Sequence, residues 1–224
     1  MTGMSMKNLY VLRHGQTEWN LIRRMQGRLD SPLTHEGMEQ AHAHGELLKS
    51  LGPIDEMYVS PSGRTRETAW IINSYVRARV EYVDALLERD LGCWSGLTVD
   101  ELEDAFPQAW QARREDPFHH RPPGGESMAD MSERCADFLV EVLASPAENI
   151  ALVTHQVMSR VILSRLLDLA VEESVLVIHP NEALYQIQVS EGVSVRHYIG
   201  GIGPFDGLLR REDDETIPPG DRYG

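Results

Sequence analysis

The chain has 224 residues, two of them cysteines, with 42% hydrophobic and 25% charged residues. These values are typical of one soluble globular domain and exclude a fibrous, wholly disordered or disulfide-framed chain. The net charge of −14 argues against a nucleic-acid partner, because phosphate backbones are bound through clustered Lys and Arg. The sequence shows neither an export signal nor a membrane-spanning run, so we expect a cytoplasmic protein with no membrane contact.

Apolar, β-branched runs alternate with helical patterns along the chain. They predict strands over 8–13, 56–60, 149–154, 183–190 and 193–199. The last two strands are separated by Glu191 and Gly192, which predicts a hairpin. A homodimer formed through the apolar edge of this hairpin is left open.

Helices are predicted between the strands from capping residues and apolar spacing. The two clearest cover 34–52, with Thr34 as N-cap, and 127–145; others follow Ser62 and His155, and a short one begins at Thr98. The polar stretch that follows, rich in Pro and Gly, predicts a loop over 111–127 and, with the short helix, a lid-like segment over 98–125.

This alternation predicts an α/β fold: a three-layer sandwich with a mainly parallel central sheet flanked by helices. A single domain is expected over 1–202. The remaining residues, 203–224, mix both charge signs with prolines and are expected to form a poorly ordered tail.

Three predicted strands end in residues that can bind or transfer an anion. Arg13 and His14 end the first strand, Arg64 lies just after the second, and His155 ends the third. In a parallel sheet ligands bind at the carboxyl ends of the strands, so we expect these side chains to converge. The histidines of the 34–52 helix, by contrast, are expected at the surface; they are His35, His42 and His44.

Such a cluster suits a phosphoryl group, whose charge spreads over three oxygens during transfer. Arg guanidinium groups match these oxygens in pairs, and a neutral imidazole can attack phosphorus and carry a covalent phosphoryl group. The leaving alkoxide then needs a proton. Glu88 is the candidate acid, with Asp90 as its rival. Arg113 and Arg114 could bind a further anionic group of a substrate or simply be solvated, and both readings stay open.

Together these segments resemble the histidine phosphatase superfamily, the phosphoglycerate mutase-like proteins, from Tyr10 to about Tyr198. The matching segments follow the family's order: "LRHGQTEWN", "QGRLDSPLTHEGMEQA", "SPSGRTRETA", "LLERDLGCWSG" and "PPGGES". One match alone is weak, whereas five in order are specific. The resemblance implies a phosphoglycerate mutase-like fold.

Carried onto this sequence, the resemblance implies that His14 is the nucleophile that forms phosphohistidine. It implies that Glu88 donates a proton to the leaving group and later activates water. The phosphoryl oxygens would be bound by Arg13, Asn20, Arg64 and His155. Contacts to the substrate are expected from Gln26, Gly27 and Gln156. Family members work without a metal, so we expect no metal and no cofactor.

The chain departs from the family at two positions. Gln156 follows His155 where glycine is usual, and Ser62 replaces a usual leucine. Family mutases have a longer segment after the counterpart of Glu88 and a small hydroxyl residue in place of Gln26, which favours the phosphatase branch here. The predicted function is therefore a metal-independent phosphomonoester hydrolase acting on a small phosphorylated metabolite. Phosphoglycerate mutase is the alternative, and Gln156 keeps a non-catalytic phosphate-binding protein open as a second one.

Overall fold

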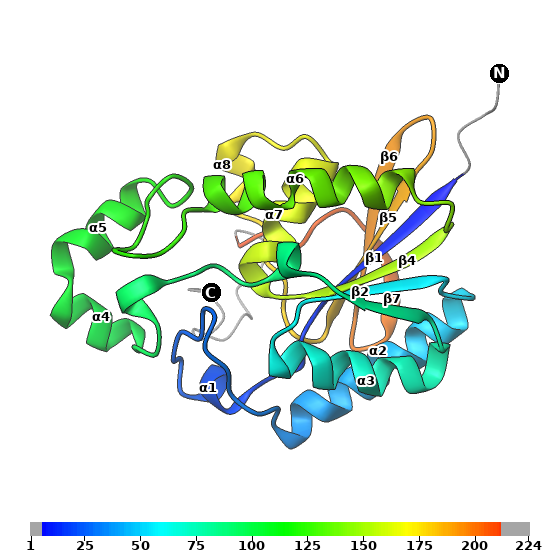
Figure 1. The fold of residues 1–224 in the computed structure, drawn as a ribbon, viewed down its shortest axis with the longest axis horizontal. Coiled ribbons are helices and arrows are strands. Elements are labelled where there is room, and N and C mark those ends of the chain that lie inside the picture. The colour runs from blue at the N-terminus through cyan, green and yellow to red at the C-terminus, as the bar shows by residue number, and fades with distance from the viewer. Residues whose placement is uncertain (1–5, 212–224) are drawn as a thin grey trace.

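The computed structural model describes residues 6–211 (Figure 1). Its seven strands form one sheet in the order β3-β2-β4-β1-β5-β6-β7. The strands are β1 (Lys7–Arg13), β2 (Glu56–Val59), β3 (Arg79–Tyr82), β4 (Asn149–Thr154), β5 (Ala183–Val189), β6 (Val193–Ile199) and β7 (Ile202–Asp206). The helices are α1 (Glu18–Leu21), α2 (His35–Leu51), α3 (Gly63–Val76), α4 (Val99–Ala105), α5 (Pro107–Glu115), α6 (Met128–Ala144), α7 (Gln156–Leu166) and α8 (Val171–Ser174), with 3-10 turns η1 (Asp84–Leu86) and η2 (Gly92–Trp94).

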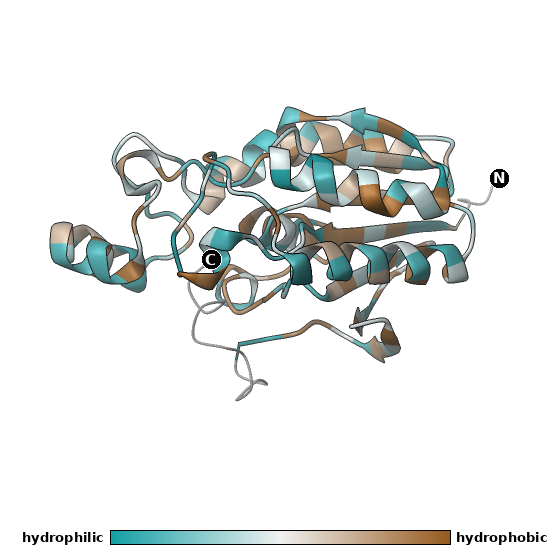
Figure 2. Ribbon diagram, turned by 90° about the horizontal axis from the view of Figure 1, so that it is seen from below, coloured by the Kyte–Doolittle hydropathy of each residue, from teal (hydrophilic) through white to brown (hydrophobic). Residues whose placement is uncertain are grey.

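The sheet is the middle of three layers, as predicted. Side chains alternate along β1, so Leu9 and Val11 pack toward α6 and α7, whereas Tyr10 and Leu12 pack toward α2 and α3. In Figure 1 these helix pairs lie above and below the sheet. Figure 2, seen from below, shows hydrophobic strand segments between helices that carry both hydrophilic and hydrophobic residues. This double cover explains why the central strands are continuous apolar runs.

The sheet is mixed rather than mainly parallel along its whole width. Strands β1 to β4 run parallel, while β5, β6 and β7 are joined to one another and to β1 by antiparallel pairs. The predicted hairpin is confirmed as β5 and β6. It is not the sheet edge, however, because β7 pairs with β6 and occupies that edge.

Several boundaries differ from the sequence predictions for identifiable reasons. Residues 111–115, predicted as loop, belong to α5, because Pro107 starts this helix at its first position instead of ending the preceding one. Strand β7 and the pairing of Val177 with Arg210 extend the folded part beyond the expected boundary at 202. Of the expected tail, 212–224 lies outside the described residues.

Helices α4 and α5, which fall in the predicted lid-like segment, project from the sheet end where β1 to β4 finish (Figure 1). They have a small apolar cluster of their own around Trp94, Leu102 and Trp110. Among residues 6–211, none of the helices combines the length and apolar character that crossing a membrane requires.

Candidate active site

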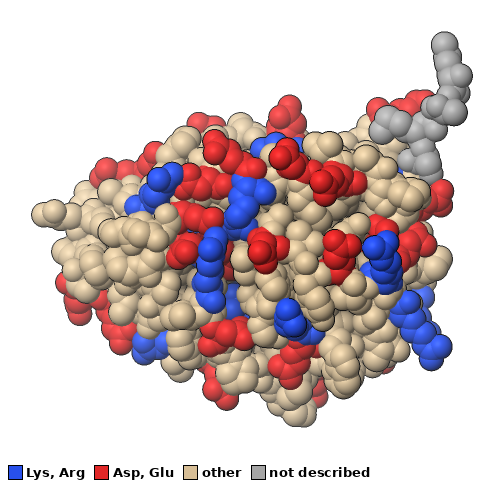
Figure 3. Space-filling view, in the orientation of Figure 1, with Lys and Arg blue, Asp and Glu red and all other residues tan. Residues whose placement is uncertain are grey.

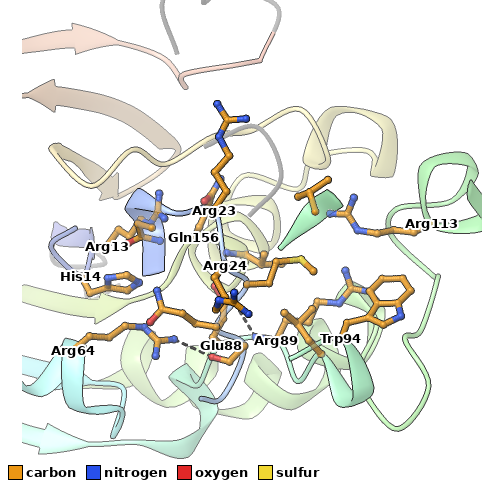
Figure 4. Close-up of a pocket in the computed structure, with 17 residues that line it drawn as sticks. Arg13, His14, Arg23, Arg24, Arg64, Glu88, Arg89, Trp94, Arg113 and Gln156 are labelled. Carbon is orange, nitrogen blue, oxygen red and sulfur yellow. Dashed lines mark hydrogen bonds between the residues drawn. The ribbon is translucent and has the colours of Figure 1, made fainter. Parts of the chain in front are cut away.

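A pocket lies at this end of the sheet, between the strand ends and α4 and α5 (Figure 4). Eight of the nine predicted site residues line it: Arg13, His14, Asn20, Gln26, Gly27, Arg64, Glu88 and Gln156. In Figure 4, Arg13, His14 and Arg64 lie toward one end of the pocket, and Trp94 and Arg113 lie toward the other. The convergence expected from the strand ends is thus present in the fold.

His14 leaves the end of β1 with its backbone still held, because its N–H donates to the carbonyl of Thr154 at 3.0 Å. Its ring Nδ1 lies 2.8 Å from the carbonyl oxygen of Gly15. A carbonyl can only accept, so Nδ1 carries the hydrogen and Nε2 keeps its lone pair. Burial, together with the guanidinium groups of Arg64 and Arg13, holds the pKa of His14 well below its ordinary value. The ring is therefore neutral and nucleophilic at neutral pH.

Gly15 is required by space rather than by an unusual backbone angle. A Cβ atom at this position would collide with the carbonyl oxygen of Gly37 in the first turn of α2. The close approach packs the turn after His14 against that helix, and the Gly15 N–H donates to the Thr68 hydroxyl on α3 at 3.1 Å. The turn is held by two helices.

Arg64 lies in the first turn of α3 and is 1% exposed. Its Nη1 donates to the Asp30 carboxylate at 2.9 Å, and its Nη2 donates to the Gly27 carbonyl at 2.9 Å. Gly27 has a positive φ of 52°, which glycine adopts without strain. These fixed contacts orient the guanidinium before any anion arrives.

His155 is the one predicted site residue that does not line the pocket. It is fully buried behind Arg64, whose Nη2 donates to the His155 Nδ1 at 2.9 Å. Nε2 therefore carries the hydrogen and donates to the Ser60 hydroxyl at 2.7 Å. The His155 ring also meets the His14 ring edge-on, with centroids 5.3 Å apart. The sequence motif that contains Ser60 does not predict this contact.

Glu88 reaches the pocket from the loop after η1, and its carboxylate faces the start of α7. Its oxygens accept the backbone N–H groups of Val157 at 3.2 Å and Met158 at 3.3 Å. These two bonds from the first turn of α7 fix the position of the Glu88 carboxyl group. The rival Asp90 lies outside the pocket lining and accepts the Gly92 N–H at 2.9 Å instead.

The loop around α1 forms one wall of the pocket. The Asn20 Oδ1 accepts the Thr17 backbone N–H at 3.0 Å, which leaves the amide Nδ2 as the group that Asn20 can offer to an anion. The Gln26 Nε2 donates to the Thr17 hydroxyl at 2.7 Å. Thr17 thus holds both predicted side chains in the wall.

The end of the pocket near Trp94 and Arg113, called the outer pocket below, was not predicted from the sequence. Its apolar lining comes from Met25, Leu91, Trp94, Val99 and Val157. Of the two cations left open, Arg113 lines the pocket and lies over the Trp110 ring at 4.7 Å, whereas Arg114 pairs with Glu103 at 3.7 Å. Arg113 lies in the last turn of α5, in a stretch that the sequence predicts as loop.

The charge of the pocket is opposite to that of the chain. Its lining holds one carboxylate, from Glu88, and six arginines: Arg13, Arg23, Arg24, Arg64, Arg89 and Arg113. On the face of the molecule in Figure 3, acidic and basic side chains are interspersed. Within residues 6–211, no group of three or more His, Cys, Asp or Glu side chains could hold a metal ion. The net positive charge of this lining is complementary to an anion.

Comparisons with known proteins identify the family of the chain. The family model of the histidine phosphatase superfamily (branch 1) matches residues 9–198. A relative from Salmonella paratyphi B, named "Probable phosphoglycerate mutase GpmB", is 36% identical over 166 residues, covering 73% of this chain and 76% of the relative. The solved structure of mycobacterial glucosyl-3-phosphoglycerate phosphatase in complex with VO3 is 31% identical, with a TM-score of 0.76, and the match covers 86% of this chain and 98% of that one.

The alpha-ribazole phosphatase from Shigella flexneri, at 24% identity, supports the fold alone, with a TM-score of 0.79 and coverage of 89% and 100% of the two chains. The family match includes the segments that carry Arg13, His14, Arg64, Glu88 and His155. The chain belongs to the histidine phosphatase superfamily, branch 1.

Proposed function

We propose that this protein is a metal-independent hydrolase of small phosphorylated metabolites, in which His14 carries the phosphoryl group. The observation that carries the proposal is the orientation of the His14 ring. Its Nδ1–H is held by the Gly15 carbonyl, so the Nε2 lone pair is available in a pocket lined by six arginines and one carboxylate. Cytoplasmic location belongs to the same proposal, as does a small metabolite as partner.

The reaction has two steps in which atoms and charges balance. The His14 Nε2 forms a bond to phosphorus while the ester P–O bond breaks, and protonated Glu88 gives its proton to the departing alkoxide. The Glu88 carboxylate then takes a proton from water, whose oxygen attacks phosphorus and breaks the P–N bond. Inorganic phosphate leaves, and His14 is neutral again. Arg13 and Arg64 supply positive charge to the equatorial oxygens in both steps.

Phosphoglycerate mutase activity is the second candidate, favoured by the name of the relative that is 36% identical to this chain. A mutase must protect its phosphohistidine from water until a second transfer. The two candidates therefore differ in the acceptor of the phosphoryl group and not in the nucleophile.

The test is phosphate release by the purified protein in chelator, across a panel that includes 3-phosphoglycerate and glucosyl-3-phosphoglycerate, with 2-phosphoglycerate formation followed in parallel. Release is the expected result, and isomerisation without release would identify a mutase. His14→Ala should abolish turnover, whereas His42→Ala, at an exposed ring on α2, should not. If the protein turned over none of the esters, the non-catalytic alternative would be favoured, and Gln156→Gly would then be the first variant to assay.

A further inference from the structure

The turn over 178–182, which no sequence motif singled out, lies beside the end of β1. It leads into β5, and β5 pairs antiparallel with β1 up to Leu12, which faces Leu184. The ladder between these strands ends there, immediately before Arg13 and His14. The turn therefore occupies the position where further strand pairing would have held the nucleophile.

Two hydrogen bonds replace that pairing, one donated by the Arg13 side chain and one accepted by the His14 backbone carbonyl. The Asn181 Nδ2 donates to the backbone carbonyl of His14 at 2.6 Å, and the Arg13 Nη1 donates to the carbonyl of His179 at 3.0 Å. On the other side, the His14 N–H is bound to Thr154 of β4. The backbone of His14 is thus held on both sides, by β4 and by the Asn181 carboxamide.

A histidine that was expected at the surface holds the turn itself. His44 is 2% exposed, and its Nε2 lies 2.9 Å from the carbonyl oxygen of Asn181, so Nε2 carries the hydrogen and donates. Asn181 is 4% exposed. A buried carboxamide keeps its hydrogen bonds because leaving them unmade is costly, so its direction is fixed.

We propose that Asn181 is a positioning residue for the nucleophile, with His44 as its anchor on α2. The inference rests on the proposed function, since it assigns a purpose to the way His14 is held. Transfer to the His14 Nε2 requires the ring to stay within a few tenths of an ångström of its reactive position. The Asn181 carboxamide is the only side chain among the described residues that donates to the His14 carbonyl.

The experiment compares Asn181→Ala and Asn181→Asp with the wild type. The aspartate keeps the shape of the side chain but presents oxygen to a carbonyl that can only accept. We expect kcat to fall about 10- to 100-fold in both, as for a nucleophile displaced by about 1 Å. The Kd for inorganic phosphate, measured calorimetrically, should stay within about threefold, because neither substitution removes a bond of the phosphate-binding arginines: Arg64 is held by Gly27 and Asp30, and Arg13 by the backbone carbonyl of His179.

The matched control is Asn149→Ala, at the opposite end of β4, where the Asn149 Oδ1 accepts a 2.9 Å hydrogen bond from Asn8. It should leave kcat unchanged. Rapid quenching should show slower phosphohistidine formation in the Asn181 variants, which a purely structural role would not predict. If Asn181→Ala does not fold, the proposal is judged on kcat and phosphate Kd of Asn181→Asp alone.

The proposal is overturned if kcat is unchanged, or if phosphate affinity and kcat fall together in parallel with the melting temperature. Failure of the proposed function would look different. The wild type would then form no phosphohistidine, and His14→Ala would match it.

Discussion

Arg64 and His155 are joined by a hydrogen bond of 2.9 Å, although Arg64 lies in the first turn of α3 and His155 lies between β4 and α7. The same guanidinium also binds Asp30 and Gly27, so a single side chain links three segments around the pocket. Its planar fork makes this possible, and the ammonium of a lysine cannot reproduce it.

We therefore expect Arg64→Lys to lower kcat/KM by about 100-fold or more, a loss similar to that of one preorganised oxyanion donor. The charge is kept while the geometry is lost. The measurement is steady-state hydrolysis of the preferred ester. Arg66→Lys is the control, because Arg66 lies on the same helix but is exposed over Tyr82. A variant of Arg64 within threefold of the wild type would contradict this role.

Glu88→Gln tests the proposed acid through the leaving group. An alkyl alkoxide needs a proton as it departs, whereas p-nitrophenolate does not. We expect kcat to fall roughly 10²- to 10⁴-fold for an alkyl phosphate, the usual contribution of general acid catalysis, and much less for p-nitrophenyl phosphate. Asp90→Asn, outside the pocket lining, should leave both rates unchanged. Equal losses on the two esters would mean that Glu88 does not protonate the leaving group.

The cluster at the strand ends, in which Arg13, His14 and Arg64 line the pocket and His155 lies behind Arg64, could be predicted because it follows from a local rule. Arg13, His14, Arg64 and His155 each lie at or just after the end of an apolar strand, and parallel strands end at one edge of a sheet. The outer pocket follows from no local rule. Val99 and Arg113 reach it because Trp94 and Trp110 pack together, a tertiary contact with no short-range signal.

The strength of the local sequence signal also decided which parts of the fold could be predicted. Strand β3 was missed because it is a largely exposed edge strand, where an apolar run is not needed. His44, by contrast, could have been predicted to be buried. It is three residues after Ala41 and four before Leu48, both of which are fully buried, so it lies on the apolar stripe of α2. The prediction of a surface position followed from histidine being polar and gave too little weight to its place on this stripe.

The buried histidines predict that the protein loses stability in mild acid. Burial lowers the pKa of His14, His44, His155 and His179, in the last case to about 3. The unfolded chain binds these protons below about pH 6.5 and the folded chain does not, so the free energy of unfolding falls as pH drops from about 6.5 toward 3.

The contribution of one histidine can be isolated with His44→Gln, which keeps a donor but does not titrate. Between pH 7.5 and 5.5, the loss of unfolding free energy in this variant should be smaller than in the wild type by up to about 1.4 kcal/mol. Urea unfolding at both pH values measures it. His35→Gln, at a ring that is 84% exposed, should change nothing. An unaltered pH dependence in His44→Gln would show that His44 is not held neutral.

Gln156 offers a test of how the pocket selects its ester. It is the first residue of α7, is 3% exposed and lines the same pocket as Arg13 and His14 (Figure 4). Replacing it with glycine removes a side chain beside the phosphoryl site but keeps the backbone N–H. We therefore expect Gln156→Gly to raise the ratio of kcat/KM for 1-naphthyl phosphate over phenyl phosphate several-fold, by about 1 kcal/mol of relieved crowding.

The affinity for inorganic phosphate should stay the same, because the side chains of Arg13, Asn20 and Arg64 are untouched. The substitution should also cost about 0.5 to 1 kcal/mol of stability, as glycine does in a helix. Gln108→Gly, at an exposed position in the first turn of α5, reproduces that cost away from the pocket. If the ester ratio moves equally in both variants, or in neither, the Gln156 side chain does not set the size of the leaving group.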